Sequence, residues 1–102
     1  MSYQTKEQSI GYLFRVFMNV GTNRNELKEV YAIANELIET GYNEITNHDT
    51  QRVLAEISER NEYDEEKRKE LNLNLMWAFN DRSVYEAGEL YKLYKAVIFE
   101  KL

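Results

Sequence analysis

The chain contains no proline and only four glycines, and this scarcity constrains its fold more than any other feature of the sequence. Loop-rich and all-β proteins need these residues at their turns, because proline fixes one backbone angle and glycine adopts angles that other residues avoid. Long helices with short connections are therefore expected. A chain of 102 residues is also long enough for one domain with a substantial core. The sequence predicts an all-α fold, a compact bundle of four to five helices that forms a single domain over residues 1–102.

The first helix is expected over residues 5–20, because Thr5 and Gln8 have the spacing of a capping box. Gly21 should end this helix in a left-handed conformation. Apolar residues recur at helical spacing, and the core-facing stripe that they predict consists of Ile10, Leu13, Phe14 and Phe17. The opposite side of the same helix is also apolar, with Tyr12 and Val16.

The second helix is expected to begin after Asn23, which can cap it, and to end at Gly41. Tyr42 should then contact Leu37, as in a Schellman motif. The core-facing residues of this helix are predicted to be Leu27, Val30, Tyr31, Ala34, Leu37 and Ile38.

Three further helices are predicted over about residues 48–61, 65–80 and 83–102. Their expected caps are Thr46 or Asn47, Asp64, and Ser83 in a capping box with Glu86. The expected inward residues are Val53, Leu54 and Ile57 in the third helix, and Ala87, Leu90, Tyr91, Tyr94, Val97 and Ile98 in the last. The second and last helices should form the most regular part of the core. Gly11 and Gly88 lie inside helices at a cost of about 1 kcal/mol each, so each should mark a close helix crossing.

The stretch LNLNLMWAF, residues 71–79, is apolar at seven of nine positions and fits two structures. As a strand it alternates leucine and asparagine with period two. A helix is favoured, because the preceding EEKRKE is made of strong helix formers and no β-branched residue occurs over residues 65–83. Helical spacing of about 100° places Leu71, Leu75, Ala78 and Phe79 on one side and Leu73, Met76 and Trp77 nearly opposite. Either this helix packs on both sides, or its second side is an exposed patch that closes against a partner or a second copy.

The composition is that of a folded protein, with 43% apolar and 30% charged residues. No uninterrupted apolar run exceeds five residues, far fewer than the about 20 that a membrane helix needs. The chain contains no cysteine, and no basic segment followed by an apolar one begins it. We therefore expect a cytoplasmic protein that makes no contact with a membrane.

The acidic surplus is concentrated in the middle of the chain. The net charge is −5, and residues 22–63 alone, with nine acidic and four basic side chains, carry a net −5. Nucleic-acid binding needs clustered lysine and arginine to displace counterions from phosphates, so nucleic acid is disfavoured as a partner. A partner with a basic surface fits this charge better.

No motif for catalysis, for a cofactor or for a metal ion occurs in the sequence. His48 is the only histidine, and its neighbour Asp49 points elsewhere on a helix, so an exposed position in a first helical turn is expected. The patterns HExxH, ExxH, GxSxG and a glycine-rich phosphate loop are all absent. Rows of carboxylates have arginines as helical neighbours and are expected to be solvated surface. A noncatalytic protein without a metal or cofactor is predicted.

These observations favour a small acidic protein that binds another protein and modulates or inhibits it, alone or as a homodimer. Small helical proteins of this kind, encoded by phages and other mobile elements, act stoichiometrically, although this step is an analogy with a class of proteins. The predicted contact residues are Leu73, Met76, Trp77 and Tyr85. Tyr85 is included because it lacks an expected place in the core, as do Tyr3, Tyr12 and Tyr63.

The alternative is a DNA-binding regulator of the helix-turn-helix type that uses residues 23–61. The residues that would reach base edges are Asn47, Thr50, Gln51 and Arg52. The acidic surplus on the same two helices speaks against this alternative, because few basic residues remain to contact phosphates.

Overall fold

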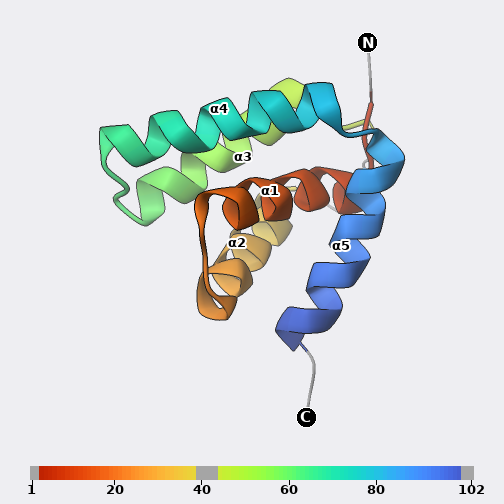
Figure 1. Cartoon of the computed structure of the whole chain (residues 1–102), viewed down its shortest axis with the longest axis horizontal. Helices are drawn as coiled ribbons and strands as arrows, with labels where there is room; N and C mark the ends of the chain where they lie inside the picture. The colour runs from red at the N-terminus through yellow and green to blue at the C-terminus, as the bar shows by residue number, and fades with distance from the viewer. Residues whose placement is uncertain (1–2, 39–43, 100–102) are drawn as a thin grey trace.

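Helix α1, Lys6–Val20, lies at the centre of the molecule with the other helices around it (Figure 1). A computed structural model of the chain describes residues 3–38 and 44–99. These residues contain five helices and no β-strand, which confirms the predicted all-α bundle. The remaining helices are α2 (Arg24–Leu37), α3 (Asn47–Arg60), α4 (Glu65–Asp81) and α5 (Val84–Phe99). Outside the helices, Gln4 and Ile45 form an isolated antiparallel bridge.

Helix α1 begins at the predicted capping box and ends at the predicted glycine, but that glycine has a different backbone conformation from the one expected. The Thr5 hydroxyl accepts a hydrogen bond from the backbone N–H of Gln8 (3.1 Å), and the Gln8 side chain accepts one from the backbone N–H of Thr5 (2.8 Å). At the other end, the N–H of Gly21 donates to the carbonyl oxygen of Phe17 (3.0 Å). Gly21 has a φ angle of +103°, which residues with a side chain rarely adopt. Its ψ angle of 122° lies outside the left-handed helical region that was expected.

Helix α1 contributes more buried residues than any other helix, and the expectation that α2 and α5 form the most regular part of the core is wrong. It contributes eight buried residues, compared with three from α2 and two from α5. The reason is that α1 contacts all four other helices, so both of its apolar sides are covered. Tyr12, for which no inward place was expected, is therefore buried, and its hydroxyl donates to the carbonyl oxygen of Arg82 (3.0 Å).

The backbones of α1 and α5 touch at Gly11. A Cβ atom on Gly11 would lie 1.8 Å from the carbonyl oxygen of Ala87, so no side chain fits there. This contact confirms the close crossing predicted at Gly11. The same prediction is wrong for Gly88, because the nearest atom to an added Cβ is Cγ of the Gln8 side chain at 3.5 Å, an ordinary contact.

Helix α2 begins as predicted but ends early. The Asn23 side chain accepts a hydrogen bond from the backbone N–H of Glu26 (2.9 Å), and the helix ends at Leu37. Leu37 was expected in the core but is exposed, because the chain leaves the helix there. Gly41 and Tyr42, predicted to complete the end of this helix, lie outside the described residues.

Helix α3 agrees with its prediction. The Thr46 hydroxyl accepts a hydrogen bond from the backbone N–H of Asp49 (3.1 Å), and the Asp49 carboxylate accepts one from the N–H of Thr46 (3.0 Å). This is a complete capping box. The three predicted inward residues, Val53, Leu54 and Ile57, are all buried.

Helix α4 contains the whole LNLNLMWAF stretch, so the strand alternative is excluded. Its cap is Asp64, as predicted, whose carboxylate accepts a hydrogen bond from the backbone N–H of Lys67 (2.8 Å). Two glutamates, Glu65 and Glu66, lie in its first turn, where the helix dipole favours negative charge. Leu71 and Leu75 are fully buried against the core.

Helix α5 begins at the predicted cap, where the Ser83 hydroxyl accepts a hydrogen bond from the backbone N–H of Glu86 (3.1 Å). Ala87 and Ile98 are buried, but Val97, also predicted to face inward, is exposed. Helix α5 crosses α1 at a steep angle (Figure 1), so only one side of it is covered. Val97 lies at the margin of the covered side.

Candidate protein-binding surface

The two apolar sides of α4 lie in different environments. The inner side is packed into the core through Leu71, Leu75 and Ala78. The outer side exposes about half of each of its large apolar side chains: Leu73 (50%), Met76 (45%) and Trp77 (55%). We call these three residues the outer patch. The sequence left two alternatives open for this side of α4. The exposure of the outer patch excludes the alternative in which α4 is packed on both sides.

The outer patch extends across the crest of α4 from the α3 side to the α1 side. Met76 faces α3, because its sulfur accepts a hydrogen bond from the side-chain amide of Gln51 (3.2 Å). Trp77 lies on the α1 side of the crest, because it lines a hollow together with Arg15 of α1. Helical spacing places Leu73 between them on the outermost line of the helix. The three side chains therefore form one continuous surface.

A hollow of about 260 Å³ separates Trp77 from helix α1. Its lining residues come from α1, from α4 and from the α4–α5 connection: Arg15, Asn19, Trp77, Ala78, Asp81 and Arg82. It is smaller than the roughly 300–1,000 Å³ of typical small-molecule sites. One or two side chains of another protein would fill it.

Arg15 is one of the residues of this surface that the sequence predictions missed. It is partly buried, and within the described residues its guanidinium has no hydrogen bond and no ion pair. By contrast, Arg82 on the same rim pairs with Glu86 (3.4 Å). The signal was present in the sequence, because Arg15 is the only charged residue between Ile10 and Val20.

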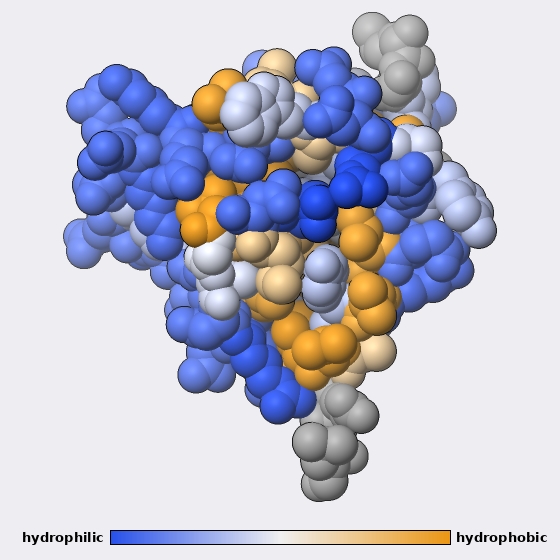
Figure 2. Space-filling model, viewed as in Figure 1, coloured by the Kyte–Doolittle hydropathy of each residue, from blue (hydrophilic) through white to orange (hydrophobic). Residues whose placement is uncertain are grey.

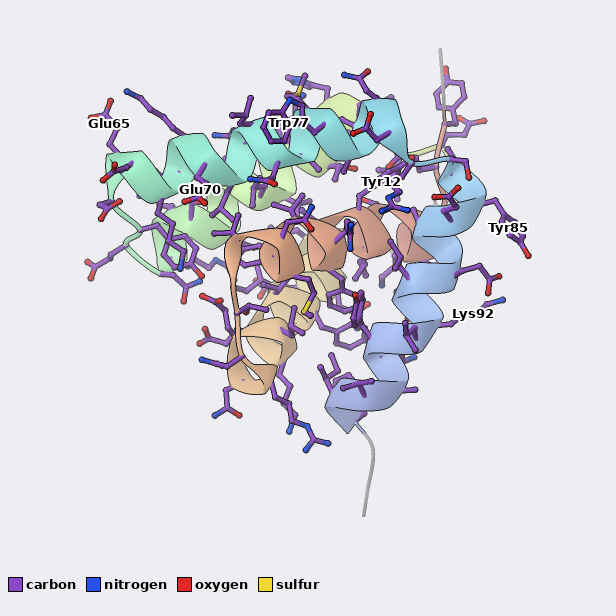
Figure 3. The ribbon with its side chains drawn as sticks, in the orientation of Figure 1. Tyr12, Glu65, Glu70, Trp77, Tyr85 and Lys92 are labelled. Atoms are coloured by element: carbon purple, nitrogen blue, oxygen red, sulfur yellow. The ribbon has the colours of Figure 1, made fainter. Side chains whose placement is uncertain are left out.

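The structure separates Tyr85 from the other predicted contact residues. Tyr85 is the most exposed of the four, at 73%, and lies in the first turn of α5. Figure 3 shows it projecting from the outer edge of α5, away from Trp77 on α4. A single compact contact centred on Trp77 therefore does not include Tyr85.

A second apolar surface lies on α5. Leu93 and Val97, one helical turn apart, are both exposed. Figure 2 shows apolar surface over α5 and, between it and α4, a band of hydrophilic side chains. The residues that line the hollow beside Trp77 do not include Leu93 or Val97, so the hollow is not part of this second surface.

Two carboxyl groups with lowered pKa values take part in contacts within the fold, one at a helix cap and one in an ion pair between helices. The backbone N–H of Thr46 lowers the pKa of Asp49 by hydrogen bonding to its carboxylate at the start of α3. Arg60 bonds to Glu36 across α2 and α3 (2.9 Å) and lowers the pKa of that carboxyl group. His48 is exposed in the first turn of α3, as predicted. Among residues 3–38 and 44–99, no three His, Cys, Asp or Glu side chains are grouped so that they could hold a metal ion.

The structure corrects one of the residues predicted to read DNA. Thr50 is buried, with its hydroxyl 2.7 Å from the Ser9 hydroxyl and donating to the side-chain oxygen of Gln4 (3.1 Å). It therefore cannot reach a base edge. Asn47, another of these residues, accepts a hydrogen bond from the Gln4 amide. The prediction failed because Gln4 and Ser9, which are far from Thr50 in the sequence, lie against it in the folded chain.

None of the five described helices combines the length and the apolar character needed to cross a bilayer.

Comparisons of the chain with protein-family models, with curated proteins and with solved structures find no match.

Proposed function

We propose that this chain is a noncatalytic, cytoplasmic protein-binding module that modulates or inhibits a partner protein through the outer patch of α4. The observation that carries the proposal is the exposure of Leu73, Met76 and Trp77 together on a helix whose inner side is already packed. Covering apolar surface gains about 25 cal/mol per Å². Trp is enriched in binding hot spots, and Met adapts to different partner surfaces. A partner that covers this patch would recover free energy that the isolated bundle does not gain.

The charge of the protein favours a partner with a basic surface. The net −5 arises mainly from residues 22–63, a range that includes α2 and α3. A field of this sign accelerates the approach of a basic protein and slows that of an acidic one, and salt weakens both effects.

The test is a comparison of proteins captured from a lysate of the producing cells. The bait is the wild type, the double variant Leu73→Gln/Trp77→Gln, or the control Glu65→Gln/Lys69→Gln, which removes an exposed ion pair (3.5 Å) at the start of the same helix. We expect a protein that the wild type and the control retain and that the patch variant loses, with identical circular dichroism for all three. Equal capture by both variants would contradict the proposal.

Light scattering on the same samples identifies a second copy as the occupant. A dimer that becomes monomeric in Leu73→Gln/Trp77→Gln would show that self-association covers the outer patch, and the role in binding another protein would then be wrong.

A further inference from the structure

We propose that the hollow beside Trp77 receives a carboxylate side chain of the partner, which Arg15 binds while a neighbouring apolar residue of the partner packs on Trp77. This inference rests on the proposed function, since it specifies the partner chemistry at the same surface. It predicts a short acidic–apolar segment at the centre of the contact.

The shape of the hollow suits a single side chain beside an aromatic wall. Trp77 and Ala78 form its apolar side, and Asn19 and Arg15 on α1 form the polar side opposite. A glutamate or aspartate inserted there would place its methylene groups against the indole and its oxygens near the guanidinium. The volume of about 260 Å³ leaves little room for a larger ligand.

The charges around the hollow select an anion. Two guanidinium groups and one carboxylate line it, a local net charge of +1 on a chain of net −5. Arg82 already pairs with Glu86, whereas Arg15 has no ionic partner among the described residues, so Arg15 is the available donor. A guanidinium presents its N–H groups as a planar fork that fits the two oxygens of a carboxylate.

Nothing in the described fold requires a guanidinium at position 15. Most of the surrounding helix is buried, and Arg15, Met18 and Asn19 form its one narrow strip that reaches the surface in this part of the chain. Arg15 caps no helix and bridges to no other helix within the described residues. Its place beside an exposed tryptophan is therefore explained by a contact with another molecule.

Asp81 lies on the same rim, and its negative charge allows the charge of the inserted group to be tested. Its carboxylate repels an inserted carboxylate, while Arg15 attracts it. Neutralising Asp81 should therefore strengthen binding of an acidic segment, and neutralising Arg15 should weaken it. A hollow that only accommodates apolar groups would respond to neither change.

The probe is a set of peptides of about 12 residues, selected from a random displayed library on the full chain and measured by titration calorimetry. We expect selected peptides to carry Asp or Glu next to a large apolar residue. Arg15→Gln should weaken their binding by about 10- to 100-fold, as expected for loss of a charge-assisted contact. Arg15→Lys, which keeps the charge but not the fork, should weaken it less, and Asp81→Asn should strengthen it. Arg52→Gln is the matched control, since it removes the same charge from exposed surface of α3 and should change nothing.

The outcomes separate this inference from the proposed function. Peptides that lose binding with Trp77→Ala but contain no acidic residue, or are unaffected by Arg15→Gln, would overturn the carboxylate site alone. Peptides unaffected by Trp77→Ala would overturn both proposals.

Two further outcomes would assign the hollow to a different occupant and overturn the inference. One is tighter binding when the acidic residue is replaced by phosphoserine, with competition by inorganic phosphate. The other is a dimer, seen by light scattering, that Arg15→Asp and Asp81→Arg each dissociate and that the double variant restores.

Discussion

Gly11 lies where the backbone of α5 leaves no room for a side chain, and it gives the clearest prediction for a single residue. An added Cβ would lie 1.8 Å from the carbonyl oxygen of Ala87. Gly11→Ala must therefore push α5 away from α1 and should lower the free energy of unfolding by about 1–3 kcal/mol or more, the usual effect of overpacking. Urea unfolding followed by circular dichroism measures this loss.

Gly88→Ala is the matched control, because it makes the same change inside a helix where space is available. The nearest atom to the new methyl group is Cγ of the flexible Gln8 side chain, at 3.5 Å. Alanine favours the helix by about 1 kcal/mol over glycine, so this variant should be as stable as the wild type or more stable. Equal losses in both variants would show that helix crossing is not what selects glycine at position 11.

At the scale of helices, a network around Glu26 joins α2 to the start of α4. The Glu26 carboxylate accepts a hydrogen bond from the Tyr63 hydroxyl (2.7 Å) and lies 3.4 Å from the Lys67 ammonium. Burial alone would raise the pKa of Glu26, but the hydrogen bonds from Thr22 and Tyr63 and the charge of Lys67 lower it on balance. Burial and the bond to Glu26 together raise the pKa of Tyr63.

This network predicts a loss of stability in acid. Because the pKa of Glu26 is lower in the folded chain than in the unfolded one, its stabilisation is complete above the unfolded pKa of about 4.3 and disappears as the pH falls through the folded pKa. Glu26→Gln should lower the free energy of unfolding by about 1–2 kcal/mol at pH 7. Urea unfolding at pH 7 and at pH 3 measures it, and a difference between wild type and variant that persists unchanged at pH 3 would contradict the assignment.

The two sides of α4 predict opposite responses to the same substitution. Leu75→Ala removes a fully buried side chain and should cost about 2–5 kcal/mol of folding stability. Leu73→Ala, two residues away on the outer patch, should change stability by less than about 1 kcal/mol. Thermal and urea unfolding compare the two variants directly. A loss at Leu73 as large as that at Leu75 would place the outer side in the core.

At the scale of the whole molecule, the elements could be predicted from sequence and their arrangement could not. The caps at Thr5, Asn23 and Asp64 act on backbone groups within three residues, so local spacing predicts them. The central position of α1 depends on which helices cover it. Tyr12 shows this, because its hydrogen-bond acceptor, the Arg82 carbonyl, lies far away in the sequence.

The candidate site divides in the same way. Helical spacing places Leu73, Met76 and Trp77 opposite an apolar side that can enter the core. Their exposure could therefore be predicted from the sequence. The hollow exists only because α1 and α4 lie side by side, so its pairing of Arg15 with Trp77 could not be predicted from either helix alone.

Quenching of Trp77 fluorescence by acrylamide in the isolated monomer tests most directly whether another molecule must cover the outer side of α4. Trp77 is the only tryptophan, so the signal comes from this site alone. At concentrations where light scattering gives the mass of one chain, we predict the long-wavelength emission of a tryptophan in contact with water and efficient quenching. Emission at shorter wavelength with resistance to acrylamide would show that the monomer buries Trp77 in its own core, and would contradict the proposed binding surface.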